Sequence, residues 1–161
     1  FRCLANLPYA ISSIFIARMS ELVSPPTEMF FLLQREMAER LAASSQSKIY
    51  GSLTVRVQAL YKVKILRIVP PEVFFPPPKV QSAFVTLKIR EDHPSPEVLK
   101  KLNQIVRAAF SQRRKVAFKL MKGCAGPKLD DAYSVLEIKR TARAEHITVE
   151  KFIALAEFLL K

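Results

Sequence analysis

The spacing of apolar and polar positions along the first sixty residues predicts strands alternating with short helices. The apolar run over residues 1–5 indicates the end of a buried strand, and apolar positions at helical spacing over 11–23 predict an amphipathic helix, which Ser24-Pro25-Pro26 ends. The run over 29–33 has the length of a strand covered on both faces. Two further short helices are expected, one through Leu41 and one over 53–60.

Two more strand patterns follow, separated by a segment rich in proline and phenylalanine. Residues 61–69 alternate apolar and basic side chains, which predicts an edge strand, and residues 81–90 carry apolar side chains at every second position. Between them, Phe74-Phe75 precedes three successive prolines. Such a segment is stiff and polyproline-like, and it holds one of the two phenylalanines in a fixed orientation, either in the core or as a platform for a ligand.

After residue 91 the strand patterns end and only helical patterns remain. Ser95-Pro96 is typical of a helix start. Later signals are Ser111 as a cap, Gly123 and Gly126-Pro127 as helix ends, a short helix over 130–138, and Thr148 as the cap of the last helix. The change predicts two domains, residues 1–91 and 92–161.

Composition points to an anionic partner. The 161 residues include 26 basic and 14 acidic ones, which gives a net charge of +12, so nucleic acid is expected and a membrane surface is the weaker alternative. No apolar run approaches the length of a transmembrane helix. Cys3 and Cys124 are isolated and indicate free thiols in a reducing compartment. No cluster of residues with metal-ligand spacing is present, so no metal is expected.

The stretch Asn6-Leu7-Pro8-Tyr9 stands at the predicted junction of a strand and a helix. Asn and Pro favour a turn there, and open α/β sheets bind ligands at the carboxyl ends of their strands. The Asn6 side chain supplies a carbonyl acceptor, Pro8 holds the preceding residue extended, and Tyr9 offers a flat face. These groups suit the exocyclic amine of a flipped nucleobase. The alternative is a plain loop, with Tyr9 packed on the core and Asn6 capping the next helix.

Basic side chains gather after Phe110, in Arg113-Arg114-Lys115 and at Lys119 and Lys122. Lys115, Lys119 and Lys122 have the spacing of one helical face. Given the charge of the whole chain, this cluster is a candidate for phosphate binding. A solvated helix face is the alternative.

Several motifs in a fixed order carry a resemblance to a known family. They are Asn6-Leu7-Pro8-Tyr9-x-Ile11-Ser12-Ser13, Gln34-x-Glu36-x-Ala38-Glu39-Arg40, Tyr50-Gly51-Ser52-Leu53, Val69-Pro70-Pro71-x-x-Phe74-x-Pro76-Pro77-Pro78-Lys79-Val80 and Phe110-x-Gln112-Arg113-Arg114-Lys115. Across nearly its whole length the chain closely resembles the small-subunit rRNA adenine dimethyltransferases, the bacterial kasugamycin-sensitivity methyltransferase family.

The resemblance implies an α/β fold, in which the C-terminal part of a Rossmann-like methyltransferase sheet precedes a small all-α domain. The family uses S-adenosylmethionine to dimethylate N6 of two adjacent adenosines near the 3′ end of small-subunit rRNA. If the family's residue roles apply to the matching positions here, the Asn6 side chain and the Leu7 or Pro8 backbone would hold the adenine, and Tyr9 and Phe74 would stack on it. Asn6 would also adjoin the methyl donor.

The resemblance also implies partners and a place in the cell. The immature small ribosomal subunit would be bound through the phosphates of its rRNA, by Arg113, Arg114 and Lys115 with Lys119 and Lys122. The protein would be cytoplasmic and, at full length, a monomer.

Two departures from the family pattern matter. Ala10 stands where the family usually has Asn, with little effect expected on the chemistry. The glycine-rich donor loop and the acidic residue that holds the donor ribose are missing, because they lie upstream of the family's Asn-Leu-Pro-Tyr and this chain has three glycines and no G-x-G. The chain, which opens on Phe1, is therefore expected to be a fragment. It is expected to bind S-adenosylmethionine weakly or not at all, and to self-associate through an exposed sheet edge.

Two other functions remain open. One is a non-catalytic rRNA-binding module in ribosome assembly. The other is the related large-subunit rRNA adenine methyltransferase of the macrolide-resistance type, which the Tyr50-Gly51-Ser52-Leu53 and Phe110 to Lys115 motifs disfavour.

Overall fold

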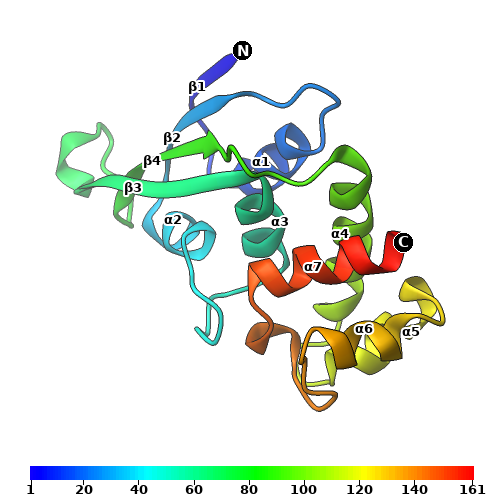
Figure 1. Ribbon diagram of the computed structural model, residues 1–161. Helices are drawn as coiled ribbons and strands as arrows, with labels where there is room; N and C mark the ends of the chain where they lie inside the picture. The colour runs from blue at the N-terminus through cyan, green and yellow to red at the C-terminus, as the bar shows by residue number, and fades with distance from the viewer.

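The computed structural model describes residues 1–161 and shows a sheet beside a group of helices (Figure 1). The strands are β1 (Arg2–Asn6), β2 (Glu28–Gln34), β3 (Tyr61–Val69) and β4 (Ser82–Ile89). The α-helices are α1 (Ser12–Ser20), α2 (Arg35–Leu41), α3 (Ser52–Leu60), α4 (Pro96–Ala109), α5 (Ala117–Ala125), α6 (Leu129–Val135) and α7 (Val149–Leu160). Short 3₁₀ turns are η1 (Pro71–Val73) and η2 (Ala144–His146). The predicted α/β class is confirmed.

The four strands form one mixed sheet in the order β1-β2-β4-β3. β1 and β2 are parallel, and β4 runs antiparallel to both of its neighbours, β2 and β3. β3 lies at the edge, as its alternating sequence predicts, and its register shifts between Ile65 and Arg67. Such an irregularity is common on edge strands, because it bends the strand away from further pairing.

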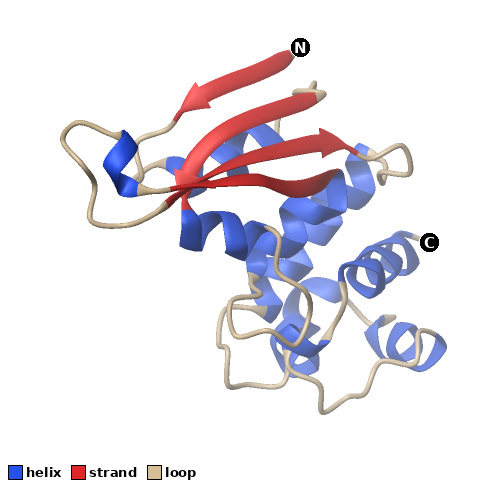
Figure 2. Cartoon of the chain, turned by 90° about the vertical axis from the view of Figure 1, so that its left-hand side faces the viewer, coloured by secondary structure: helices blue, strands red, loops and turns tan.

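All three helices of the first ninety residues cover the same face of the sheet. Ile16 of α1, Leu41 of α2 and Val57 of α3 share a core with Phe31 of β2 and Val85 of β4. Figure 2 shows helices below the sheet and behind it.

The expectation that β2 is covered on both faces is therefore wrong for this chain. β2 alternates between fully and partly buried side chains, because only one of its faces meets helices. The expected burial of the first strand is wrong for the same reason, since β1 is an edge strand and Leu4 on it is 77% exposed.

Helix caps in the second half follow the sequence at most positions. The Ser95 and Thr148 side chains accept hydrogen bonds from the backbone N–H groups of Val98 and Lys151, so both predicted caps are confirmed. Gly126, with φ +83°, follows the end of α5, in the left-handed region that glycine tolerates. Gly123 was expected to end that helix but lies within it.

Ser111 is not a cap. Its hydroxyl donates to the Ala108 carbonyl at the end of α4, and α5 begins six residues later, after Val116. The chain between the two helices is an exposed turn, because the charged run that follows Phe110 has no apolar side chain to bury.

The helical half shares a core with part of the first half. Tyr50, Val55 and Ala59 belong to the same buried cluster as Ile105 of α4 and Phe152 of α7. Leu99 of α4 packs against both this core and the core beneath the sheet. The division at residues 91 and 92 stays a prediction, and α3 serves as the layer between sheet and helices (Figure 1). None of the helices combines the length and the hydropathy needed to cross a membrane.

Two buried tyrosines allow a test of how the parts are joined. The Tyr50 hydroxyl donates to the Ile147 carbonyl at 3.0 Å, whereas the equally buried Tyr133 hydroxyl has no partner. Tyr50→Phe leaves a buried carbonyl unsatisfied, so we expect it to lower the free energy of unfolding by about 1–3 kcal/mol. Tyr133→Phe removes an already unpaired hydroxyl and is expected to be neutral or stabilising. Urea unfolding of the two variants measures both values, and equal losses would contradict the assignment.

Candidate functional site

One end of the sheet contains the last residues of β1, β2 and β3 and the first residue of β4, and the Asn6-Tyr9 turn follows β1 at this end. Asn6 and Gln34 are the last residues of the parallel strands β1 and β2. Ser82, the first residue of β4, pairs with Gln34 on one side and with Val69, the last residue of β3, on the other. The carboxyl end of parallel strands is the usual place for ligands in such sheets.

The turn after β1 is held by local hydrogen bonds. The Ile11 N–H donates to the Pro8 carbonyl at 3.1 Å, and the Ser12 hydroxyl donates to the Tyr9 carbonyl at 3.0 Å. Leu7 points into the core beneath the sheet and anchors the turn. The polypeptide therefore presents Asn6, Pro8 and Tyr9 from a fixed backbone.

The plain-loop alternative does not describe this turn. The N-cap of α1 is Ile11, and no side chain caps that helix, so Asn6 has no capping role. The Asn6 side chain is exposed and makes no hydrogen bond within the chain. Tyr9 is half-buried and does not belong to either core. Both groups are accessible to a ligand.

The Tyr9 side chain is hydrogen-bonded to an interior strand of the sheet, β4. Its hydroxyl lies 2.7 Å from the Ser82 hydroxyl, although 73 residues separate them. Ser82 is fully buried. The sequence provides no signal for this pair, because a single serine at the start of a strand is not a motif and only the strand order brings it beside Tyr9.

The aromatic-proline loop rises from the same point. It leaves the sheet after Val69 and returns at Ser82, which are paired with each other. Within it Phe74 is half-buried and Phe75 is 101% exposed, and the Phe75–Pro76 peptide bond is cis. Phe74 and Tyr9 do not form a ring pair with each other.

The base of this loop is fastened to α2 by Arg35. Its backbone N–H donates to the Gln81 carbonyl at 2.9 Å, and its guanidinium donates to the Gln81 side-chain oxygen at 2.8 Å. The same guanidinium pairs with Glu39 at 2.7 Å. The return of the loop into β4 is thus held on both sides, by Arg35 at Gln81 and by Tyr9 at Ser82.

The basic cluster is divided between a turn and a helix. Arg113, Arg114 and Lys115 lie in the exposed turn between α4 and α5, so the expectation that Lys115 shares a helical face with Lys119 and Lys122 is wrong. The helix that was expected to include Lys115 begins at Ala117.

Two of these basic side chains have contacts within the protein. Arg113 donates to the Lys48 carbonyl at 2.6 Å, which joins the basic turn to the loop before α3. The Lys122 ammonium lies 5.3 Å from the centre of the Phe118 ring. Arg114, Lys115 and Lys119 remain exposed and free to bind an anion.

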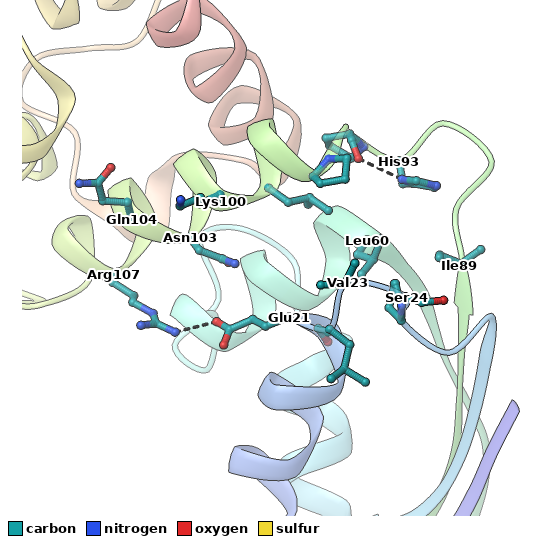
Figure 3. Close-up of a pocket in the computed structure, with 16 residues that line it drawn as sticks. Glu21, Val23, Ser24, Leu60, Ile89, His93, Lys100, Asn103, Gln104 and Arg107 are labelled. Carbon is teal, nitrogen blue, oxygen red and sulfur yellow. Dashed lines mark hydrogen bonds and ion pairs between the residues drawn. The ribbon is translucent and has the colours of Figure 1, made fainter. Parts of the chain in front are cut away.

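A large cavity lies at the opposite end of the sheet from the Asn6-Tyr9 turn. It has a volume of about 920 Å³ and opens between the end of α1, the start of β2 and helix α4 (Figure 3). Pro25 precedes β2, and Ile89 ends β4, so this space adjoins the strand ends remote from Tyr9. No side chain of the candidate site lines it.

The floor of this cavity joins the sheet half to the helical half. Glu21 accepts a hydrogen bond from Arg107 of α4 at 2.6 Å (Figure 3). It also accepts one from Arg56 of α3. Burial lowers the pKa of Arg56, and the carboxylate of Glu21 opposes that shift. Both guanidinium groups are therefore occupied by Glu21, and the three residues form a structural link between α1, α3 and α4.

Two features that the family resemblance implies for the donor site, a glycine-rich loop after a strand and an acidic residue at a strand end, are not found in this chain. The three glycines lie before α3, within α5 and after α5, and none follows a strand. The parallel strands end in Asn6 and Gln34, and no acidic side chain stands there to hold a ribose. The weak or absent donor binding expected from the sequence therefore stays a prediction.

Comparison with known proteins extends over the whole chain. A ribosomal RNA small subunit methyltransferase A from Vibrio cholerae is 42% identical over 159 residues, which are 98% of this chain and 58% of that protein. Proteins of the same name from Herminiimonas arsenicoxydans and Bordetella petrii are each 39% identical and cover 98% and 99% of this chain. This chain spans 60% of each of those two proteins, so it is about three fifths of the length of its relatives.

Solved structures share the fold. A dimethyladenosine transferase from Plasmodium falciparum superposes with a TM-score of 0.79 at 24% identity, over 96% of this chain and 64% of that one. A 23S rRNA methyltransferase superposes with a TM-score of 0.71 at 21% identity, over 100% of this chain and 66% of that one. The Rossmann-like class expected from the sequence is confirmed by these superpositions. A family profile described as ribosomal RNA adenine dimethylase matches residues 1–161, and the chain belongs to that family.

Proposed function

We propose that this chain is the C-terminal part of an S-adenosylmethionine-dependent rRNA adenine N6-dimethyltransferase, which acts on two adjacent adenosines near the 3′ end of small-subunit rRNA. The observation that supports it best is the turn after β1. It combines an unpaired Asn6 amide, a free backbone carbonyl and a half-exposed Tyr9 ring at the carboxyl end of parallel strands. The relatives that match this chain are named for small-subunit methyl transfer.

The proposed chemistry is the positioning of a weak nucleophile. The lone pair of an aromatic amine is delocalised into the ring, so two acceptors that hold its hydrogens favour a more pyramidal and more reactive nitrogen. The Asn6 side-chain oxygen is one acceptor. The Leu7 carbonyl is the better second one, because the Pro8 carbonyl already accepts the Ile11 N–H. S-adenosylmethionine supplies an activated methyl group with its own leaving group, so no general base is required.

Two aromatic side chains would complete the adenine pocket. Tyr9 stacks on one face of the flipped base, and Phe74 closes the other side from the loop between β3 and β4. Phe74 is favoured over Phe75 because it is half-buried and so held in place, whereas Phe75 projects fully into solvent. The sheet domain, residues 1–91, would carry the chemistry, and the helical domain, residues 92–161, would bind the rRNA.

The rRNA would bind through exposed cations of the turn and of α5. Arg114 and Lys115 have no partner in the chain, and Lys119 and Lys122 lie on the neighbouring helix. Each cation that neutralises a phosphate releases counterions and so makes the affinity depend on salt. Arg113 also has a structural role, because its guanidinium donates a hydrogen bond to the Lys48 carbonyl and so holds the turn in place. We assign the protein to the cytoplasm, where immature small subunits would be its partner.

We first predict that removal of the Asn6 acceptor abolishes most methyl transfer. In the chain extended by its upstream coding sequence, Asn6→Ala should lower kcat on immature small subunits about a hundredfold or more, because a positioned polar group at the reacting atom is lost. Gln104→Ala, an exposed amide on α4, is the control and should leave kcat unchanged. Incorporation of labelled methyl groups is the measurement.

The same assay separates the alternatives. Transfer to large-subunit rRNA alone would favour the macrolide-resistance type of enzyme. rRNA binding with no transfer by the extended chain would favour the non-catalytic assembly module. Either result contradicts the proposed function.

A second prediction concerns the donor. Titration calorimetry of residues 1–161 with S-adenosylmethionine should show no tight, stoichiometric binding, because the chain lacks a glycine-rich loop after a strand and an acidic residue at the parallel strand ends. The extended chain, measured under the same conditions, should bind one equivalent. Tight binding by residues 1–161 alone would contradict the prediction.

A third prediction separates specific phosphate contacts from net charge. Arg114→Ala with Lys115→Ala should weaken rRNA binding and reduce the slope of log affinity against log salt by about 1–2. The matched control, Lys62→Ala with Lys64→Ala, removes the same charge from exposed positions on the edge strand β3. Filter binding over a salt series measures both. Equal loss in the two double variants would show that only the overall charge matters.

We also propose that the chain alone self-associates through β1. Its outer edge is unpaired, and Phe1 and Leu4 expose apolar surface beside it. The full-length protein, in contrast, would be a monomer.

A further inference from the structure

One hydrogen bond joins the two halves of the proposed adenine pocket. Tyr9 Oη lies 2.7 Å from Ser82 Oγ. Ser82 is the first residue of β4, and its register partners are Gln34 on β2 and Val69 on β3. It is fully buried, and it sits between two paired strands in the interior of the sheet. The tip of the Tyr9 side chain is thus attached to one of the most constrained positions in the fold.

Either hydroxyl can donate this hydrogen bond. The direction does not affect the positioning of the ring, because removal of either hydroxyl removes the bond.

Tyr9 is consequently held at two places by two serines. Ser12 donates to its backbone carbonyl at 3.0 Å, which fixes the turn, and Ser82 holds the far end of its side chain. Without the second bond, the ring remains attached at Cα only and can rotate about χ1. A stacking platform is useful only if its plane is set before the base arrives, because ordering it later reduces the gain from stacking.

The loop that carries Phe74 begins after Val69 and ends before Ser82, and these two residues are opposite each other in neighbouring strands. Val69 and Ser82 are paired, and all the residues between them form the loop. A hydrogen bond at Ser82 therefore sets the Tyr9 ring relative to the base of that loop. Arg35 independently holds the neighbouring residue, Gln81, through its backbone N–H and its guanidinium.

We propose that Ser82 is a positioning residue that sets the plane of the Tyr9 ring, and so the position of the target adenine between Tyr9 and the Phe74 loop. The inference rests on the proposed function, since it presumes that a base stacks on Tyr9. Ser82 itself need not touch the base. Its effect should appear in the reaction step, because the proposed phosphate contacts come from the turn after α4 and from α5, and neither Tyr9 nor Ser82 belongs to those segments.

The test uses the extended chain and removes the hydrogen bond from either side. Ser82→Ala and Tyr9→Phe should each lower kcat about three- to tenfold, with KM for immature small subunits unchanged. The double variant should be no worse than either single one, because both remove the same bond. Ser82→Thr keeps the hydroxyl and should retain activity. Thr86→Val, which removes a half-buried hydroxyl elsewhere on β4, should leave kcat unchanged.

A second readout follows the base itself. rRNA with 2-aminopurine at the target position reports stacking through the quenching of its fluorescence. Ser82→Ala and Tyr9→Phe should reduce the quenching by the same fraction, and Thr86→Val should not. Tyr9→Phe leaves the buried position intact, so the test does not depend on whether Ser82→Ala folds.

The outcomes distinguish this inference from the proposed function. Tyr9→Ala, which removes the ring, should lower kcat at least tenfold more than Tyr9→Phe. If Tyr9→Ala strongly lowers kcat while Ser82→Ala and Tyr9→Phe have the kcat of the wild type, Ser82 has no positioning role and the proposed function stands.

If the kcat losses of the two single variants multiply in the double variant, the two hydroxyls act separately and the inference fails. If the extended wild-type chain transfers no methyl group and Tyr9→Ala leaves 2-aminopurine quenching unchanged, the proposed function fails first.

Discussion

The candidate site depends on the insertion of β4 between β2 and β3. β4 runs against both neighbours, so its first residue lies where they end, next to the turn that follows β1. Ser82 is thereby brought to Tyr9, and the loop with Phe74 is brought over the same end of the sheet. With the same four strands but β4 at an edge of the sheet, Ser82 would not be placed beside Tyr9, and the Phe74 loop would not be placed over this end of the sheet.

The helical half is also part of this arrangement. Tyr50, Val55 and Ala59 are buried among the helices that follow residue 95, and Glu21 pairs with arginines from α3 and α4. Arg113 adds a hydrogen bond from the basic turn to the loop before α3. The basic turn proposed to bind rRNA phosphates is thus held at a defined place relative to the turn proposed to receive the base. Positioning of this kind is what a reaction limited by orientation requires.

Most elements were predictable because their signals are local. The strands 61–69 and 81–90, the caps Ser95 and Thr148, and the stop at Gly126 all follow from period, capping and backbone preference. The errors have a common cause. The burial of β1 and β2 depends on which faces meet helices, and the places of Ser111 and Lys115 depend on how a charged turn packs. Neither is encoded in a short window of sequence.

The sequence by itself determined the family, the α/β class, the strongly basic character of the chain and the position of the Asn6-Tyr9 turn, because ordered motifs, hydrophobic period and net charge are properties of the chain. Only the tertiary structure decided that Asn6 is free and not a cap, that the Pro8 carbonyl is occupied, and that Ser82 holds Tyr9. These facts join residues up to 73 positions apart. They follow from the strand order, which sets the distances between segments and cannot be read from the residue types that it brings together.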